Sequence, residues 1–118
     1  MSRAWLLAAL ALSGCAAPGP GSPSDPLTAT EFLEARLAAG STAWVAATLI
    51  DDGEARLCDQ VMESYPPQCG GPDLFVEYPA DLPMEEASGV RWTPWRTFEV
   101  VVLDATHVRV VAVAPPEE

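Results

Sequence analysis

The feature that most constrains this chain is the contrast between its first 26 residues and the rest. Arg3 precedes an uncharged apolar run over residues 4–12, then come Ser13, Gly14 and Cys15, and residues 16–26 consist mainly of Pro, Gly, Ser and Ala. The apolar run is far shorter than the ~20 residues of a transmembrane helix. A charged start, a short apolar core and small residues before a cleavage point are typical of a secretory signal. About 90 residues then remain for folding, enough for one small domain.

The signal ends in a motif with a specific chemistry. Leu12-Ser13-Gly14-Cys15 resembles the lipobox of bacterial lipoproteins, Leu-(Ala/Ser)-(Gly/Ala)-Cys. The resemblance implies that residues 1–14 are a signal peptide, that Cys15 carries diacylglycerol on its sulfur, and that the protein is exported and attached to a membrane through this lipid. The anchor would lie on the outer face of the cell membrane or in the outer membrane, and a residue other than Asp after the cysteine favours the latter. The alternative is an ordinary secretory signal with an incidental cysteine.

Residues 15–26 are expected to be the lipidated cysteine and a tether. A Pro-, Gly- and Ser-rich segment without apolar periodicity is typical of a semi-extended linker. Its reach is at most roughly 35 Å, so the folded domain, expected at 27–114, should lie close to the bilayer. Residues 115–118 are expected to be a frayed acidic tail.

The charge balance narrows the choice of partners. The chain has 17 Asp and Glu residues against six Lys and Arg, and its net charge is −11. Nucleic-acid binding usually requires a basic face, so no nucleic-acid partner is expected, and contact with anionic lipid headgroups is also repulsive. The charge either keeps a tethered domain soluble or attracts a cationic partner.

A helix is predicted over residues 29–38. Thr28 and Glu31 have the spacing of a capping box, and Leu27 and Phe32 have that of a hydrophobic staple. Gly40 is a suitable residue to follow the last helical turn.

The remainder reads as short strands separated by turns. The strands are expected at 42–50, 55–58, 74–78, within 90–103 (clearest from Thr97) and 107–113, with turns at 51–54 and 104–106, a helical turn at 59–65 and an acidic loop at 79–89. The predicted fold class is therefore mainly β. It is either a small five-stranded antiparallel barrel like that of oligonucleotide/oligosaccharide-binding (OB) domains or a curled open sheet, with one N-terminal helix.

Cys58 and Cys69 are the other two cysteines. In an exported domain whose Cys15 is lipidated they are the only pair that can form a disulfide. Such a bridge closes a loop worth roughly 3 kcal/mol in the chain-entropy model. A redox pair or a metal site is the alternative. Redox pairs, however, usually have the Cys-x-x-Cys spacing, and a zinc site needs four ligands, to which only His107 could add one.

The segment around these cysteines resembles small uncharacterised lipoproteins of high-GC bacteria. The matching residues are Leu57-Cys58, then Ser64-Tyr65-Pro66-Pro67-Gln68-Cys69-Gly70-Gly71, and later Gly89-Val90-Arg91-Trp92. The resemblance covers roughly residues 44–113 and implies a shared fold and an envelope location, but no activity. The prolines and glycines of the motif indicate a structural role around the disulfide.

Trp92 and Trp95 flank Thr93-Pro94 and are the candidate ligand platform. Two indoles beside a proline can stack on a sugar or a Pro-rich peptide. The alternative is that both rings close one end of a small core.

Other polar groups offer weaker candidates. Asp51, Asp52 and Glu54 lack the spacing of an EF-hand calcium loop and fit a hairpin turn. Glu85 and Glu86, near Asp81, could be paired acids for glycoside hydrolysis but fit a solvated loop better. His107 has no Gly-x-Ser-x-Gly partner motif and fits a strand surface.

The expected function follows from the lipobox, the tether and the lack of a catalytic motif. The chain is predicted to be a lipid-anchored, non-enzymatic envelope protein that binds or supports another envelope component, without cofactor, metal or catalytic residues. The alternative is a small-ligand or glycan-binding module that uses Trp92 and Trp95.

Overall fold

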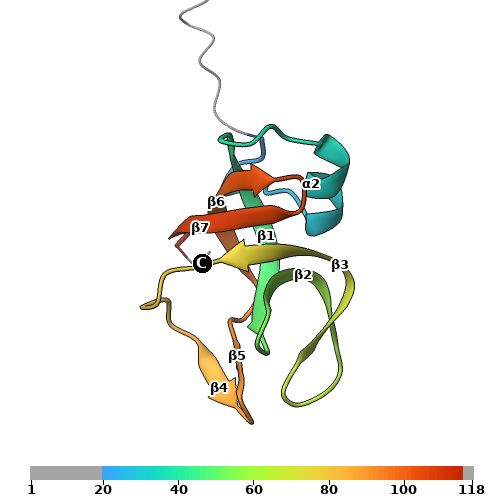
Figure 1. Ribbon diagram of the computed structural model, residues 1–118, viewed down its shortest axis with the longest axis vertical. Helices are drawn as coiled ribbons and strands as arrows, with labels where there is room; N and C mark the ends of the chain where they lie inside the picture. Colours follow the sequence, from blue (N-terminus) through green and yellow to red (C-terminus); the bar gives the residue numbers. More distant parts are fainter. Residues whose placement is uncertain (1–19, 116–118) are drawn as a thin grey trace, which may run out of the picture.

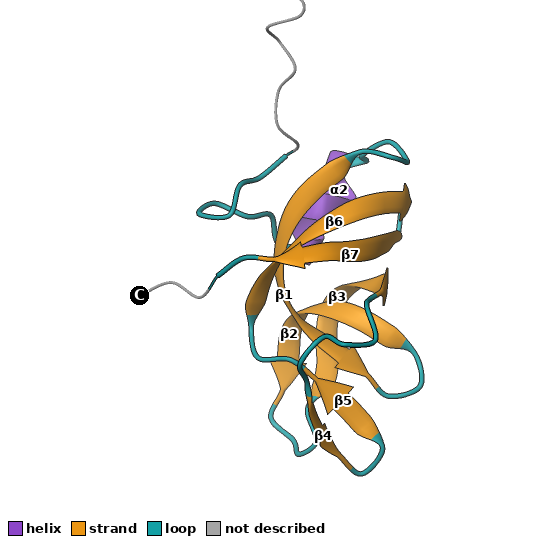
Figure 2. Ribbon diagram, turned by 90° about the vertical axis from the view of Figure 1, so that its left-hand side faces the viewer, coloured by secondary structure: helices purple, strands orange, loops and turns teal. Residues whose placement is uncertain are grey.

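Hairpins dominate the computed structural model, which describes residues 20–115 (Figures 1 and 2). The elements in this part of the chain are the helix α2 (Ala29–Ala35) and the strands β1 (Thr42–Asp51), β2 (Ala55–Met62), β3 (Gln68–Glu77), β4 (Glu85–Ala87), β5 (Val90–Trp92), β6 (Arg96–Asp104) and β7 (His107–Val113). The predicted signal peptide, Cys15, residues 16–19 of the predicted tether and residues 116–118 lie outside the described residues.

Five of the strands close into a barrel. The order is β2-β3-β7-β6-β1, and β1 pairs again with β2, so the ring has no open edge between its first and last strands. This confirms the predicted OB-like barrel over the open sheet. The pairing is not wholly antiparallel as predicted, since β3 and β7 run parallel. The reason is that the β4–β5 hairpin intervenes and carries the chain to the far side of the ring before β6 begins. That hairpin attaches to the end of β1 through Ile50 and Asp51, which pair with Trp92 and Arg91.

The barrel interior is built from alternate positions of the strands. Every second residue along a strand points to the same face of the sheet. Ala43, Val45, Ala47 and Leu49 of β1 are 1% exposed or less, and β6, β7, β2 and β3 contribute inward residues in the same way, namely Phe98, Val100, Val102, Val108, Val110, Leu57, Leu74 and Val76. Phe32 of α2 joins this core, so the helix covers one end of the barrel.

At the N-terminus of α2, each of the first backbone N–H groups donates a hydrogen bond. The predicted capping box is present, since Thr28 Oγ accepts from the N–H of Glu31 at 3.0 Å and Glu31 Oε1 accepts from the N–H of Thr28 at 2.9 Å. Asp59 of β2 accepts from the N–H groups of Ala29 and Thr30 at 3.1 and 3.2 Å. The helix is therefore held to the barrel by a carboxylate as well as by Phe32.

The predicted helix end and one predicted helical turn are wrong. The helix ends at Ala35, because Arg36 takes a left-handed conformation with φ 52°, four residues before Gly40. Residues 59–62 form no helical turn, because β2 continues to Met62 and finds ladder partners in Gln68, Cys69 and Gly70, and residues 63–65 belong to the connection to β3. A short strand, β4, lies in the predicted 79–89 loop.

Part of the predicted tether is attached to the barrel. The N–H of Trp44 donates to the carbonyl of Pro20 at 3.1 Å, the N–H of Leu27 donates to the carbonyl of Trp44 at 2.8 Å, and the N–H of Ala46 donates to the carbonyl of Leu27 at 2.8 Å. This contact arises because β2 pairs only with the last four residues of β1, from Thr48 on, and leaves the earlier edge of β1 free. Residues 20–27 cover that edge.

Within residues 20–115, the structure has no helix with the length and apolar character needed to span a bilayer.

Candidate binding groove

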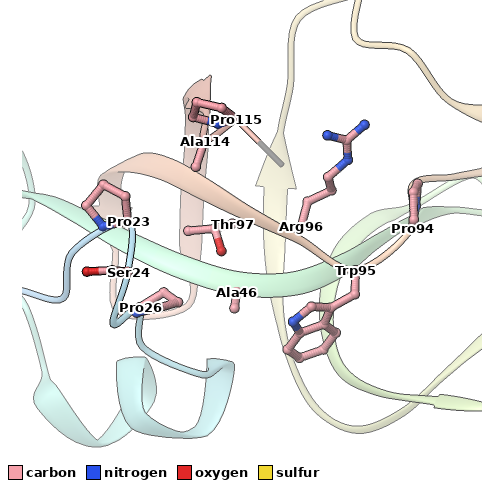
Figure 3. Close-up of a pocket in the computed structure, with 10 residues that line it drawn as sticks. All are labelled: Pro23, Ser24, Pro26, Ala46, Pro94, Trp95, Arg96, Thr97, Ala114 and Pro115. Atoms are coloured by element: carbon pink, nitrogen blue, oxygen red, sulfur yellow. The ribbon is translucent and has the colours of Figure 1, made fainter. Parts of the chain in front are cut away.

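A groove of about 600 Å³ lies where residues 20–27 approach β1, β6 and the C-terminal end of the barrel (Figure 3). Its floor is formed by the small side chains Ala46, Thr97 and Ala114. Ala46 pairs with Thr97 across β1 and β6, and the N–H of Ala114 donates to the carbonyl of Thr97 at 2.9 Å. Short side chains at these adjacent positions leave the hollow unfilled.

The walls of the groove are unusually rich in proline. The lining residues beyond the floor are Pro23, Ser24, Pro26, Pro94, Trp95, Arg96 and Pro115. None of the lining residues is an acid, a histidine or a cysteine. Proline rings are rigid and lack an N–H, so the walls offer apolar faces whose shape is set before any ligand arrives.

Trp95 and Arg96 give the groove its strongest recognition groups. The Trp95 residue is 52% exposed, and it is one of few large apolar residues in the described part of the chain with that much free surface. Figure 3 shows the Trp95 and Arg96 side chains pointing away from each other on the chain that enters β6. No carboxylate among residues 20–115 forms an ion pair with Arg96, whereas Arg56 and Arg109 both have one. Arg96 can therefore donate to a ligand without first losing a salt bridge.

A second hollow of about 270 Å³ continues the groove. It shares Arg96, Ala114 and Pro115 with the first hollow, and its other lining residues are Leu82, Pro83, Thr93, Phe98 and Val113. Because the two hollows share these three lining residues, an elongated ligand can contact both.

The structure does not bring Trp92 and Trp95 together into one platform. Trp92 is only 7% exposed and packs with Ile50 and Cys58 in a second small core. Its ring meets the edge of Tyr65 at a centroid distance of 5.6 Å. Trp92 therefore has the structural role that was the alternative interpretation, and only Trp95 presents a free ring.

Thr93 explains this separation. It is 2% exposed, and its N–H donates to the carbonyl of Leu49 at 2.9 Å. Its Oγ accepts from the N–H of Leu49 at 3.2 Å and donates to the carbonyl of Pro94 at 2.8 Å. Because Thr93 is locked to β1, Trp92 before it is held inside and Trp95 after Pro94 emerges outside.

The predicted disulfide is present. Cys58 and Cys69 are bonded, with their Cα atoms 5.5 Å apart, a normal separation for a disulfide. Cys58 is fully buried. The bridge joins β2 to β3, and Cys58 packs with Ile50 and Trp92 in the second small core, so its position fits a structural role.

Asp51 and Asp52, two of the acidic candidates, are engaged in local contacts. Asp51 accepts a hydrogen bond from the Tyr78 hydroxyl at 2.6 Å, and burial, followed by this bond, raises the pKa of Tyr78. Asp52 pairs with Arg56 at 3.4 Å. Gly53 has φ 113°, as the predicted turn requires. Among residues 20–115 no three His, Cys, Asp or Glu side chains gather in a way that suits a metal ion.

His107 is exposed and contacts the turn that precedes β7. Its Nδ1 is 2.8 Å from Asp104 Oδ1, and the N–H of Thr106 donates to the same oxygen at 2.9 Å. The Thr106 N–H first and the His107 bond second lower the pKa of Asp104 below its ordinary value of 3.8. The His107 ring also stacks on Phe75 at 4.8 Å, which is consistent with the strand-surface interpretation.

Sequence reasoning found Trp95 but missed the rest of the groove. Pro23, Ser24 and Pro26 were assigned to a free tether, and Arg96, Thr97 and Ala114 carried no motif. These residues converge only because residues 20–27 add to β1. The one available signal was the density of proline on both sides of the domain.

Scans of this chain against protein-family models, curated proteins and solved structures each returned no match. The groove therefore has to be interpreted from its own chemistry.

Proposed function

We propose that this chain is a lipid-anchored, non-enzymatic binding module of the bacterial cell envelope, and that its groove holds a saccharide. The observation that carries the ligand assignment is the half-exposed Trp95 ring beside an open, preformed groove. Ligand sites typically combine apolar and aromatic walls with a few polar groups that set orientation, and this groove has that composition.

The groove chemistry favours a neutral saccharide. The C–H face of a pyranose ring packs on an indole face, and aromatic side chains supply such contact area with little loss of freedom. Ser24, Thr97 and Arg96 line the same groove and supply hydroxyl and guanidinium donors for sugar oxygens. An anionic polysaccharide is disfavoured because the chain carries a net charge of −11. The absence of an acid, histidine or cysteine in the lining supports binding rather than hydrolysis.

The envelope location is supported by the lipobox-like Leu12-Ser13-Gly14-Cys15. Since residues 20–27 are bound to β1, only the stretch between Cys15 and Pro20 separates the proposed lipid from the described domain. That stretch spans at most roughly 18 Å. A lipid on Cys15 would thus hold the groove, whose wall includes Pro23 and Ser24, near the membrane surface.

The location is tested by fractionating cells that express the wild-type protein or Cys15→Ser. We expect the wild type in the membrane fraction and the variant in the soluble exported fraction. Mass spectrometry of the wild-type protein should find a mature chain that begins at lipid-modified Cys15. An unmodified Cys15, or membrane retention of the variant, would refute the anchor.

The ligand is tested by two-dimensional NMR titration with chito-oligosaccharides and cello-oligosaccharides, with a proline-rich peptide as the competing ligand class. We expect the Trp95 indole signal to shift with an oligosaccharide. Trp95→Ala should weaken binding about tenfold or more, and Trp95→Phe should restore part of it. Tyr65→Ala removes an exposed aromatic ring elsewhere and is the matched control. A response to the peptide alone would reject the saccharide assignment but retain the groove.

A further inference from the structure

The C-terminal end of the described chain lies at the groove. Pro115 lines both hollows, and the sequence continues with Pro116-Glu117-Glu118, which lies outside the described residues. We name residues 116–118 the acidic tail. Because successive Cα atoms are about 3.8 Å apart, the Cα of residue 117 lies within about 8 Å of that of Pro115. At least one carboxylate therefore stays near the groove, whatever path the acidic tail takes.

The register of β6 and β7 indicates which groups of the groove face the acidic tail. The N–H of Ala114 donates to the carbonyl of Thr97 at 2.9 Å, which extends the β6–β7 ladder by one pair beyond its last paired residues. In an antiparallel ladder each step forward along one strand is a step back along the other. The next two positions of this register place Pro115 opposite Arg96 and the following residue opposite Trp95.

The two faces of this ladder assign a partner to each of the next two residues. Opposite residues share a face, and every second residue along a strand returns to it. In this register Pro116 would share the face of Trp95, and Glu117, like Pro115, would share the face of Arg96. Figure 3 shows the Trp95 and Arg96 side chains pointing away from each other, as opposite faces require. Diagonal neighbours on adjacent strands are about 7–8 Å apart, which long side chains can span.

Arg96 has the charge and the freedom to pair with Glu117. Within residues 20–115 no carboxylate forms an ion pair with Arg96, whereas Arg56 and Arg109 each have one. The net charge of the chain is −11, so most of the surface repels an acidic segment. Arg96, next to Pro115 in the lining of both hollows, therefore offers the acidic tail a nearby favourable charge.

Trp95 matches Pro116 in the same way. Its residue is 52% exposed, and proline rings dock well against aromatic walls. Pro116 has no N–H to donate to β6, so the contact depends on side chains and gains no further ladder hydrogen bond from this residue. Exposed ion pairs stabilise a structure only a little, and the contact is therefore readily reversible.

We infer that the acidic tail folds over the groove, with Pro116 on the Trp95 ring and Glu117 paired with Arg96, and that it competes there with the ligand. Attachment at Pro115 gives the tail a high effective concentration, so a low intrinsic affinity is sufficient. The contact itself does not depend on what the groove binds, whereas the competition rests on the proposed function. Salt screens exposed ion pairs, and high salt should therefore uncover the groove.

Two-dimensional NMR of the purified full-length protein tests the contact without any ligand. The double variant Glu117→Gln and Glu118→Gln removes the charges of the acidic tail, and we expect it to shift the Arg96 Nε–H and Trp95 indole signals. Sodium chloride at about 0.5 M should move the wild-type signals toward those of the double variant. When Arg96→Gln is also present, the double variant should no longer change the Trp95 signal.

Glu34 and Arg36 provide the matched controls. Both are exposed residues at the end of α2, and Arg36 also has no ion pair within residues 20–115. The Arg36 Nε–H signal should not respond to the double variant, and Glu34→Gln should not shift the Arg96 and Trp95 signals. Unchanged Arg96 and Trp95 signals in the double variant, or shifts that appear only as the protein concentration rises, would overturn the contact.

Titration with the oligosaccharide tests the competition. The double variant should bind about threefold more tightly than the wild type, the scale of losing one exposed ion pair. A neutral sugar has no charge for salt to screen, so a gain in wild-type affinity at high salt reports release of the acidic tail. Equal affinities of wild type and double variant would overturn the competition. If no variant bound the oligosaccharide, the proposed ligand would be refuted instead, and the same comparison with the proline-rich peptide would decide the competition.

Discussion

Removal of the Asp59 carboxylate should destabilise the domain by about 2 kcal/mol. This side chain accepts from the N–H groups of Ala29 and Thr30 at 3.1 and 3.2 Å and from the Thr30 hydroxyl at 2.5 Å. Replacement of a residue that caps a helix N-terminus by alanine typically costs about 0.5–2 kcal/mol, and hydrogen bonds to a charged group lie toward the upper end of the usual range. Asp59 also places a negative charge at the positive end of the helix. We therefore expect a loss of stability at the upper end of the range for capping residues.

The assay is thermal and urea unfolding of the disulfide-bonded protein at neutral pH. A loss of about 2 kcal/mol in a domain of this size corresponds to a fall in Tm of roughly 8–16 °C. Asp59→Asn keeps one acceptor oxygen, so it should lower the free energy of unfolding by about half as much as Asp59→Ala does. NMR should show the amides of Ala29 and Thr30 exchanging faster in both variants, while barrel amides are unaffected at low denaturant.

Glu63→Ala is the matched control, because Glu63 is an exposed acid of the same β2–β3 hairpin and surface changes of this kind usually stay within about 0.5 kcal/mol. If Asp59→Ala destabilised no more than Glu63→Ala, the carboxylate would not be what holds α2 to the barrel. The attachment would then have to be assigned to the burial of Phe32 alone.

Three further predictions concern other parts of the domain. Replacement of Cys58 and Cys69 by serine should lower the free energy of unfolding by roughly 3 kcal/mol in urea titrations, and a change below about 1 kcal/mol would show that the bridge adds little. Gly21 has φ 73°, and an added Cβ would lie 2.9 Å from the Trp44 carbonyl oxygen, so Gly21→Ala should release residues 20–27 and speed hydrogen exchange at the Trp44 amide; unchanged exchange would contradict the edge-covering role. The folded pKa of Asp104 lies below its ordinary value, so its contribution to stability is complete above that value and disappears as the pH falls through the folded pKa. The stability difference between wild type and Asp104→Asn should accordingly vanish on acidification, and a difference that grew instead would reverse the assigned sign.

Local sequence patterns predicted most of the elements of this domain. The Thr28 and Glu31 capping box needs residues only three apart, and it is present as expected. The alternating apolar residues of β1 and the Gly53 turn also depend on near neighbours, so they too were accessible from sequence. The mainly β class followed from these patterns, which left a closed barrel and a curled sheet as alternatives. The Cys58–Cys69 pairing was predicted separately, from the expected lipidation of Cys15.

The errors arose where a distant partner overrode the local preference. Residues 59–62 were assigned to a helical turn, but the ladder to Gln68–Gly70 and the disulfide hold them in β2. Residues 20–27 look like a linker by composition, and only the free edge of β1 makes them part of the fold. Trp92 and Trp95 look equivalent in the sequence, and the hydrogen bonds of Thr93 to Leu49 decide which ring is buried.

The sequence alone determined the helix start, the hairpin turn at Gly53 and the positions of most strands, because capping, turn conformation and alternation are properties of residues close together in the chain. Tertiary structure decided where the groove lies, which tryptophan faces solvent and that residues 20–27 attach to the barrel. Each of these depends on which strand edge is left unpaired when the barrel closes, and backbone hydrogen bonding between segments distant in the chain settles that only in the folded molecule.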